Sequence, residues 1–141
     1  MLTTLNSNNF HDGIVQHLMV DIETQQTLLK LKQWNLPDND HYTISELTFN
    51  GVVWQDFKHF SNFNCLSDIE VGDSFEEFAK YKNDYLIKMS GYFSVGTLES
   101  IKADASLSYY YLNSSSGLDG FIICRRLSIV ETQYQTNSNR Y

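Results

Sequence analysis

The sequence has few of the residues that build linkers and none of the long apolar runs that cross membranes. It contains one proline, Pro37, and seven glycines among 141 residues, which leaves little room for flexible linkers. No apolar run approaches the roughly 20 residues that a membrane-spanning helix needs. Residues 1–9 are polar and lack the basic and apolar regions of a secretory signal. We therefore expect a cytoplasmic protein without a membrane partner.

Cysteine is also scarce, because only Cys65 and Cys124 are present and they lie far apart in the chain. There is no Cys-x-x-Cys pair and no cluster of His and Cys at the spacing of metal ligands. We expect two buried, free thiols, as is typical of the reducing cytoplasm, and no bound metal. A single disulfide in an exported protein is the alternative.

Basic residues are outnumbered. Ten Lys and Arg stand against 17 Asp and Glu, which gives a formal net charge of −7, and only Arg125 and Arg126 are adjacent. Binding to phosphates needs clustered Lys and Arg, so the composition argues against nucleic acid as a direct ligand. An acidic balance favours a basic protein partner, because opposite charges steer the two molecules together.

The motifs of enzyme active sites are missing as well. The sequence contains no Gly-x-Ser-x-Gly motif and no glycine-rich phosphate loop, and residues 114–117 (Ser-Ser-Ser-Gly) are expected to form a polar loop. His17 and Asp21 share one face of a predicted strand, but four residues along a strand separate them by about 13 Å, too far to bind one ion. We predict neither an enzyme nor a bound cofactor.

Strand patterns are abundant, and the nine Tyr and nine Phe favour half-buried sheet surfaces. Alternating apolar and polar side chains predict strands at residues 13–23, 28–33, 42–50, 65–71, 92–101, 105–112 and 121–131. Residues 52–60 are compatible with either a strand or a helix. Residues 34–41 and 113–120 are predicted loops, and residues 1–10 and 132–141 are predicted frayed ends.

One segment, residues 75–89, follows a helical pattern instead. Side chains that recur every three or four residues form one face of this helix: Phe75, Phe78, Lys82, Tyr85, Leu86 and Met89. Asp73 or Ser74 is the expected N-cap, with Glu77 three residues after Ser74 as in a capping box. Gly91 is the expected stop. We expect this to be the only helix.

These elements predict a single α+β domain over residues 1–141. Short strands with short connections favour an antiparallel, curved meander sheet or half-open barrel packed on one central helix. A β-sandwich is the alternative fold.

An acidic stretch accompanies the predicted helix, because no Lys or Arg occurs between Lys58 and Lys80. The candidate partner-binding acids are Asp68, Glu70, Asp73, Glu76, Glu77 and Asp84. One interpretation is an ordinary solvated helix, with acids near the positive end of its dipole. The other is a docking surface for a cationic partner.

Tyr110 is the remaining candidate for partner binding. In the strand predicted at residues 105–112, Tyr109 and Tyr111 face one side and Tyr110 the other. We expect Tyr110 to reach the outer face, where tyrosine often anchors an interface. Packing of these rings in the core and at the sheet edge is the alternative.

Three short runs resemble small bacterial immunity proteins, which are encoded beside contact-dependent or polymorphic growth-inhibition toxins. They are His-Asp-Gly at 11–13, Leu-Thr-Phe-Asn-Gly-Val at 47–52 and Gly-Phe-Ile-Ile at 120–123. The resemblance implies a cytoplasmic antitoxin that occludes the active site of a cognate toxin domain, often a basic nuclease. It assigns no role to any single residue. The alternative function is a small-ligand carrier, in which Phe and Tyr line an apolar pocket inside a curved sheet.

Overall fold

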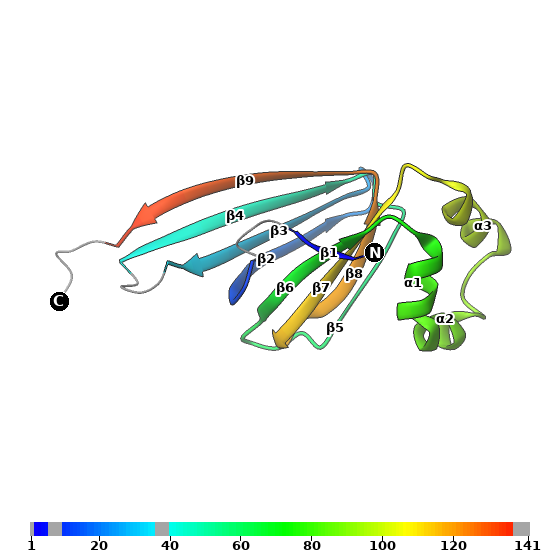
Figure 1. The fold of residues 1–141 in the computed structure, drawn as a ribbon, viewed down its shortest axis with the longest axis horizontal. Helices are drawn as coiled ribbons and strands as arrows, with labels where there is room; N and C mark the ends of the chain where they lie inside the picture. Colours follow the sequence, from blue (N-terminus) through cyan, green and yellow to red (C-terminus); the bar gives the residue numbers. More distant parts are fainter. Residues whose placement is uncertain (1, 6–9, 36–39, 137–141) are drawn as a thin grey trace.

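A curved antiparallel sheet with three short helices at one end forms the fold in the computed structural model, which describes residues 2–5, 10–35 and 40–136 (Figure 1). The strands are β1 (Thr3–Thr4), β2 (Gly13–Asp21), β3 (Gln26–Trp34), β4 (His41–Asn50), β5 (Trp54–Lys58), β6 (Cys65–Gly72), β7 (Ser108–Ser116), β8 (Asp119–Cys124) and β9 (Arg126–Gln135). The helices are α1 (Phe75–Tyr81), α2 (Asn83–Met89) and α3 (Val95–Ala103). None of these helices is long and apolar enough to cross a membrane.

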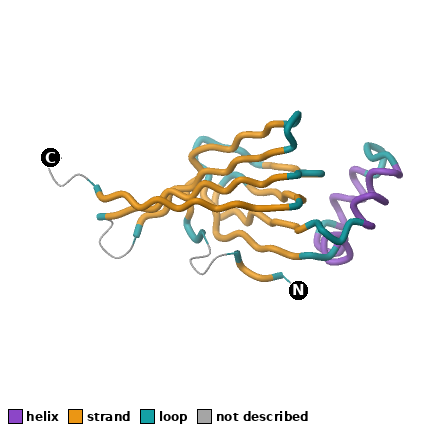
Figure 2. The backbone as a smooth tube through the Cα atoms, turned by 90° about the horizontal axis from the view of Figure 1, so that it is seen from above, coloured by secondary structure: helices purple, strands orange, loops and turns teal. Residues whose placement is uncertain are grey.

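The described strands form one sheet in the order β5-β8-β7-β6-β2-β3-β4-β9, with β1 paired to β6. The predicted α+β class with a curved antiparallel sheet is confirmed in this form, and the first two long strands, β2 and β3, pair as a hairpin. The alternative sandwich is wrong, because the strands belong to one continuous sheet. Figure 2 shows the helices gathered beyond one end of that sheet.

The sheet bends where β4 leads to β5 and where β8 leads to β9. The Val53 amide donates to the Ile123 carbonyl at 2.9 Å, and the Arg125 amide donates to the Asn50 carbonyl at 3.1 Å. These two bonds connect the β4–β9 pairing to the β5–β8 pairing. Gly51 makes the corner with φ +67°, and a Cβ there would lie 3.1 Å from the Arg125 Cβ. Glycine is therefore required both by its dihedral angle and by the crossing side chain.

Side chains of the strands themselves fill the inside of the curve. This first core combines residues of β3 and β4 with residues of β6, β7 and β8, and its fully or nearly fully buried members include Phe10, Leu29, Leu31, Leu47, Phe49, Leu66, Ile69, Leu112 and Ile122. The prediction that the sheet packs on one central helix is not confirmed, because no helix occupies this space in the described part of the chain. The curve is stabilised by apolar contact between its two halves.

A second core lies on the opposite face of β7 and β8, beneath the helices. Phe78 and Tyr85, which are buried as the helical pattern predicted, pack here with Tyr109, Tyr111 and Phe121. The Trp54 ring lies among them, 5.6 Å from the Phe78 centroid and 5.6 Å from that of Phe121. The helices therefore cover one end of the outer face of the sheet.

The helical region differs from its prediction in two ways. The predicted single helix is divided into α1 and α2 at Lys82. Residues 92–101, a predicted strand, contain the start of α3, so the expectation of one helix is wrong. The Ser94 hydroxyl accepts from the Thr97 amide at 3.3 Å, which caps α3 as Ser74 caps α1. Local capping therefore outweighs a weak period-two pattern.

Several strand boundaries also differ. Residues 113–120 are not a loop, because β7 continues to Ser116 and β8 begins at Asp119 around Gly117, whose φ is +75°. Residues 54–58 of the ambiguous segment form β5. The predicted strand 121–131 is divided at Arg125 into β8 and β9. The turn signals marked the wrong positions, because register in the sheet decides where a hairpin closes.

The predicted frayed ends are wrong where the structure describes them. Residues 132–135 belong to β9 and pair with β4, while Thr3 and Thr4 pair with β6, and Phe10 is fully buried. Residues 1, 6–9 and 137–141 lie outside the described residues, as do residues 36–39 of the predicted loop at 34–41. Chain ends are ordered when they add a strand to a sheet.

Candidate functional site

Two of the predicted acids are held together on the outer face of β6. Asp68 and Glu70 lie on one side of the strand, with Ile69 directed into the first core on the other. Asn113 on the neighbouring β7 donates its amide to Asp68 Oδ1 at 2.7 Å and to Glu70 Oε1 at 2.7 Å. One amide group therefore bridges two carboxylates that would otherwise repel each other.

A third carboxylate, that of Glu77 on α1, lies at the end of β6, with its Oε1 atom buried. The Ser74 hydroxyl accepts from the Glu77 amide at 3.1 Å, which fixes the first turn of the helix. Glu77 then extends over Gly72 at the end of β6, where a Cβ would lie 3.0 Å from Glu77 Oε1. The cap and the missing side chain at Gly72 together position this acid next to β6.

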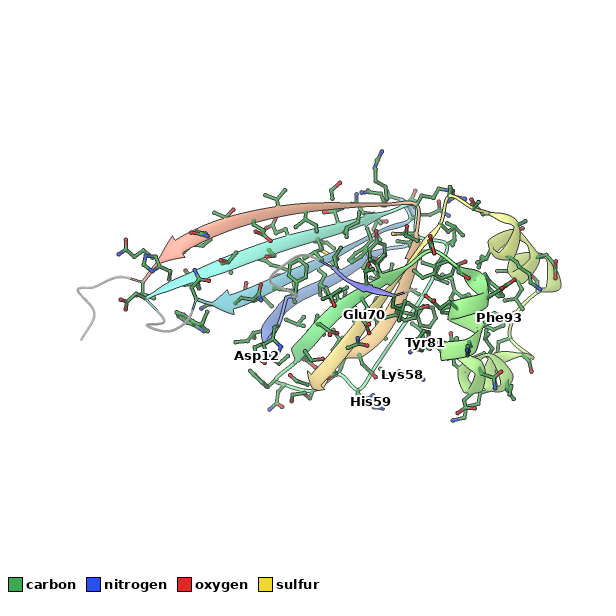
Figure 3. All side chains as sticks on the ribbon, in the orientation of Figure 1. Asp12, Lys58, His59, Glu70, Tyr81 and Phe93 are labelled. Carbon is green, nitrogen blue, oxygen red and sulfur yellow. The ribbon has the colours of Figure 1, made fainter. Side chains whose placement is uncertain are left out.

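Tyr81, one turn after Glu77, completes the arrangement. Its ring is 60% exposed, and its centroid lies 5.9 Å from that of the buried Tyr111. Burial, reinforced by the charge of Glu77 and by Tyr109, Tyr81 and Glu70, raises the pKa of Tyr111 well above its usual range. In Figure 3, Glu70 lies over the strands and Tyr81 lies on the side of α1 nearer to them. We call Asp68, Glu70, Glu77, Tyr81 and Asn113 the acidic surface.

The other predicted acids are exposed but lie apart from this arrangement. Asp73 precedes α1, Glu76 lies on α1, and Asp84 lies in the first turn of α2. Adjacent helical residues point about 100° apart, so Glu76 and Glu77 face different directions. Sequence order therefore grouped six acids, of which the fold joins Asp68 and Glu70 through Asn113 and places Glu77 at the end of the same strand.

Tyr110 does not reach the outer face, so that prediction is wrong. It is 8% exposed and lies in the first core, where its ring packs edge-on against Phe49 at 5.2 Å between centroids. Both faces of β7 are covered at this position, by β4 on one side and by α1 on the other. The exposed aromatic residue of the site is instead Tyr81. It follows Glu77 by four residues, a spacing that places two side chains on the same face of a helix.

No metal or nucleophile chemistry is evident in the described residues. No three His, Cys, Asp or Glu side chains in this part of the chain are close enough together to hold a metal ion. Cys65 and Cys124 are buried and free, which confirms the thiol prediction. Burial raises the pKa of the Cys124 thiol to about 11, so this group is not an activated nucleophile.

A cavity of about 500 Å³ lies outside the curve of the sheet, between α3 and the corner at Arg125. Its walls combine hydroxyl groups with apolar side chains: Ser94, Thr97, Ser100, Val53, Leu107 and Ile101. At its border, Arg125 Nη2 lies 3.1 Å from Asp104 Oδ2. The space where the sequence predicted an apolar pocket is occupied by the first core.

The three runs that resemble immunity proteins have structural positions. Residues 11–13 lead from a turn into β2, residues 47–52 end β4 at the Gly51 corner, and residues 120–123 lie in β8. None of them contributes to the acidic surface. No protein-family model, curated protein or solved structure matches the chain.

Proposed function

We propose that this chain is a cytoplasmic immunity protein that binds a cognate, basic toxin domain of the nuclease type and occludes its active site. The observation that supports this proposal is the acidic surface. Asp68 and Glu70 share the Asn113 amide on the sheet, Glu70 and Glu77 both act on Tyr111, and the exposed Tyr81 packs beside that ring, in a chain of net charge −7.

The chemistry of the acidic surface suits Lys and Arg side chains. Asn113 occupies one acceptor position on Asp68 and one on Glu70, and an ionised carboxylate has about four. Arginine can bind the remaining positions in a bidentate manner. Tyr81 adds an exposed ring of the type that anchors interfaces. A nuclease holds phosphates with basic side chains, so the same surface would compete for them.

The test measures binding to the product of the neighbouring gene by surface plasmon resonance at two salt concentrations. The variant Asp68→Asn, Glu70→Gln, Glu77→Gln keeps an acceptor oxygen on each side chain and removes three charges. We expect association to slow by roughly tenfold or more at low salt, because charge steering acts on the association rate. Dissociation should also accelerate where an acid is buried against a toxin cation, a loss of about 2–5 kcal/mol.

The matched control is Asp73→Asn, Glu76→Gln, Asp84→Asn, which removes the same number of charges from exposed positions outside the acidic surface. If binding depends on local geometry, this control should slow association less than the first variant does. Equal effects would show that only net charge matters. Unchanged rates for the first variant would eliminate the acidic surface as the docking site.

A second candidate function is the carriage of a small ligand, and the cavity beside α3 favours it. Its volume of about 500 Å³ is within the range of ligand sites. Gly96 lines the cavity, and a Cβ there meets no atom within 4 Å. Gly96→Leu should therefore occupy the space and also favour the helix. Native mass spectrometry of the purified chain would detect a retained ligand, which this variant should lose; finding none in the unmodified chain would count against carriage.

A further inference from the structure

The two edges of the sheet are protected to different degrees. At one edge, β5 has five residues, of which Asp56 and Lys58 are charged. At the other, β9 has ten residues and pairs with β4 alone among the described strands (Figure 1). Proteins protect sheet edges with short strands, charges or proline, because unpaired backbone groups recruit further strands. Each edge strand carries two charges, but β5 is short, whereas β9 is twice as long and contains no proline.

β9 combines a long edge with several exposed apolar side chains. Its sequence, RLSIVETQYQ, contains no Pro and no Lys. Three large apolar side chains are substantially exposed: Ile129 at 38%, Val130 at 59% and Tyr134 at 44%. The free edge needs hydrogen bonds to backbone groups, so the partner that fits it is another extended strand.

We propose that β9 pairs with β9 of a second copy of this chain, antiparallel across a twofold axis beside Val130. The two β9 strands would not repel each other, because β9 combines one Arg with one Glu and is neutral in a chain of net charge −7. The dimer would have one continuous sheet through both copies. It is independent of the proposed toxin binding, because β2, β3 and β4 separate β9 from the acidic surface on β6.

The register follows from the side chains of β9. In an antiparallel pair, opposite residues point to the same face of the sheet. The twofold axis must therefore pass through one position of β9, where a residue lies opposite the same residue of the second copy. An axis at Val130 pairs residues 126–134 and places Arg126 opposite Tyr134, a favourable cation–π arrangement. Ser128 then lies opposite Thr132. An axis at Glu131 would give the same overlap but would bring two carboxylates together, which is destabilising.

The dimer should be weak, because one added strand pair gives an interface at the small end of the specific range. We expect a dissociation constant on the order of micromolar. Sedimentation velocity over roughly 1 to 100 μM would then show a shift from monomer to dimer. A chain that is monomeric over this whole range would overturn the proposal.

The discriminating variant is Val130→Lys. It brings two ammonium groups together on the axis, and we expect dimerisation to weaken at least about tenfold. The monomer should tolerate the change, because Val130 is exposed and lies opposite Glu46 of β4. Met19→Lys is the matched control, since Met19 is also 59% exposed but lies on β2, inside the sheet order. Equal loss of dimer in both variants, or in neither, would overturn the assignment to β9.

Cross-linking tests the axis itself. Val130→Cys should give a disulfide-linked dimer on mild oxidation, because residues opposite each other in antiparallel strands meet the Cα separation that a disulfide needs. Ile129→Cys, which would face Glu131, should cross-link poorly. The native Cys65 and Cys124 are buried and do not compete. Cross-linking of the Ile129 variant alone would overturn the axis at Val130.

Discussion

Replacing Phe78 by alanine tests whether α1 is held to the sheet as the structure indicates. Phe78 is fully buried, and five rings surround it: Trp54, Phe75, Tyr109, Tyr111 and Phe121, at centroid distances of 5.0 to 6.4 Å. Burying such a ring contributes about 1.5–3 kcal/mol of transfer free energy. The cavity left behind and the lost ring contacts raise the cost of Phe78→Ala to about 3–5 kcal/mol.

Urea unfolding monitored by circular dichroism and tryptophan fluorescence measures this loss. The Trp54 ring lies 5.6 Å from the Phe78 ring, so its emission reports directly on the site, and a Trp34→Phe background removes the second tryptophan. Tyr81→Ala on the same helix is the control. Tyr81 is 60% exposed, and its removal should cost less than about 1 kcal/mol. A loss below about 1 kcal/mol for Phe78→Ala would refute the docking of α1 by this face.

Three further predictions concern local features. Ser74→Ala should destabilise the fold by about 1 kcal/mol in urea unfolding, because the cap to the Glu77 amide is lost; no change would show that the cap is replaced by water. Thiol titration should find Cys65 and Cys124 only after denaturation, and finding fast-reacting thiols in the native protein would contradict their burial. Burial first, and then a hydrogen bond to Asp56, raises the pKa of Tyr85 from 10.0 to about 12, so its contribution to stability is full below pH 10 and is lost as the pH rises towards 12. The free energy of unfolding should therefore be lower near pH 11 than near pH 9. This decrease should be smaller for Tyr85→Phe.

Local signals in the sequence were sufficient for several elements. Period-two alternation predicted the strands that became β2, β3, β4 and β6. The Ser74 cap and the spacing of Phe78 and Tyr85 predicted the start and the buried face of α1 and α2. These predictions succeed because capping and amphipathic periodicity involve residues that are neighbours along the chain.

Alternation of apolar and polar residues was insufficient where both faces of a segment are covered, or where neither face is. It placed Tyr110 opposite Tyr109 and Tyr111 correctly, but it could not show that β4 covers the Tyr110 face. Alternation also predicted a strand at residues 92–101, where α3 begins. Few of the described side chains in this segment are buried, Ile101 among them, so its pattern says little about a buried face. Which face of a strand is covered depends on packing between distant segments.

The charge and the scarcity of basic residues of this protein were determined by its sequence alone, because they are sums over residues. The acidic surface was decided by the tertiary structure. Asn113 bridges Asp68 and Glu70 across 45 and 43 residues of sequence, and only the register between β6 and β7 places the amide there. The exposed edge of β9 has the same origin, since a strand becomes an edge through its place in the sheet order and not through its own residues.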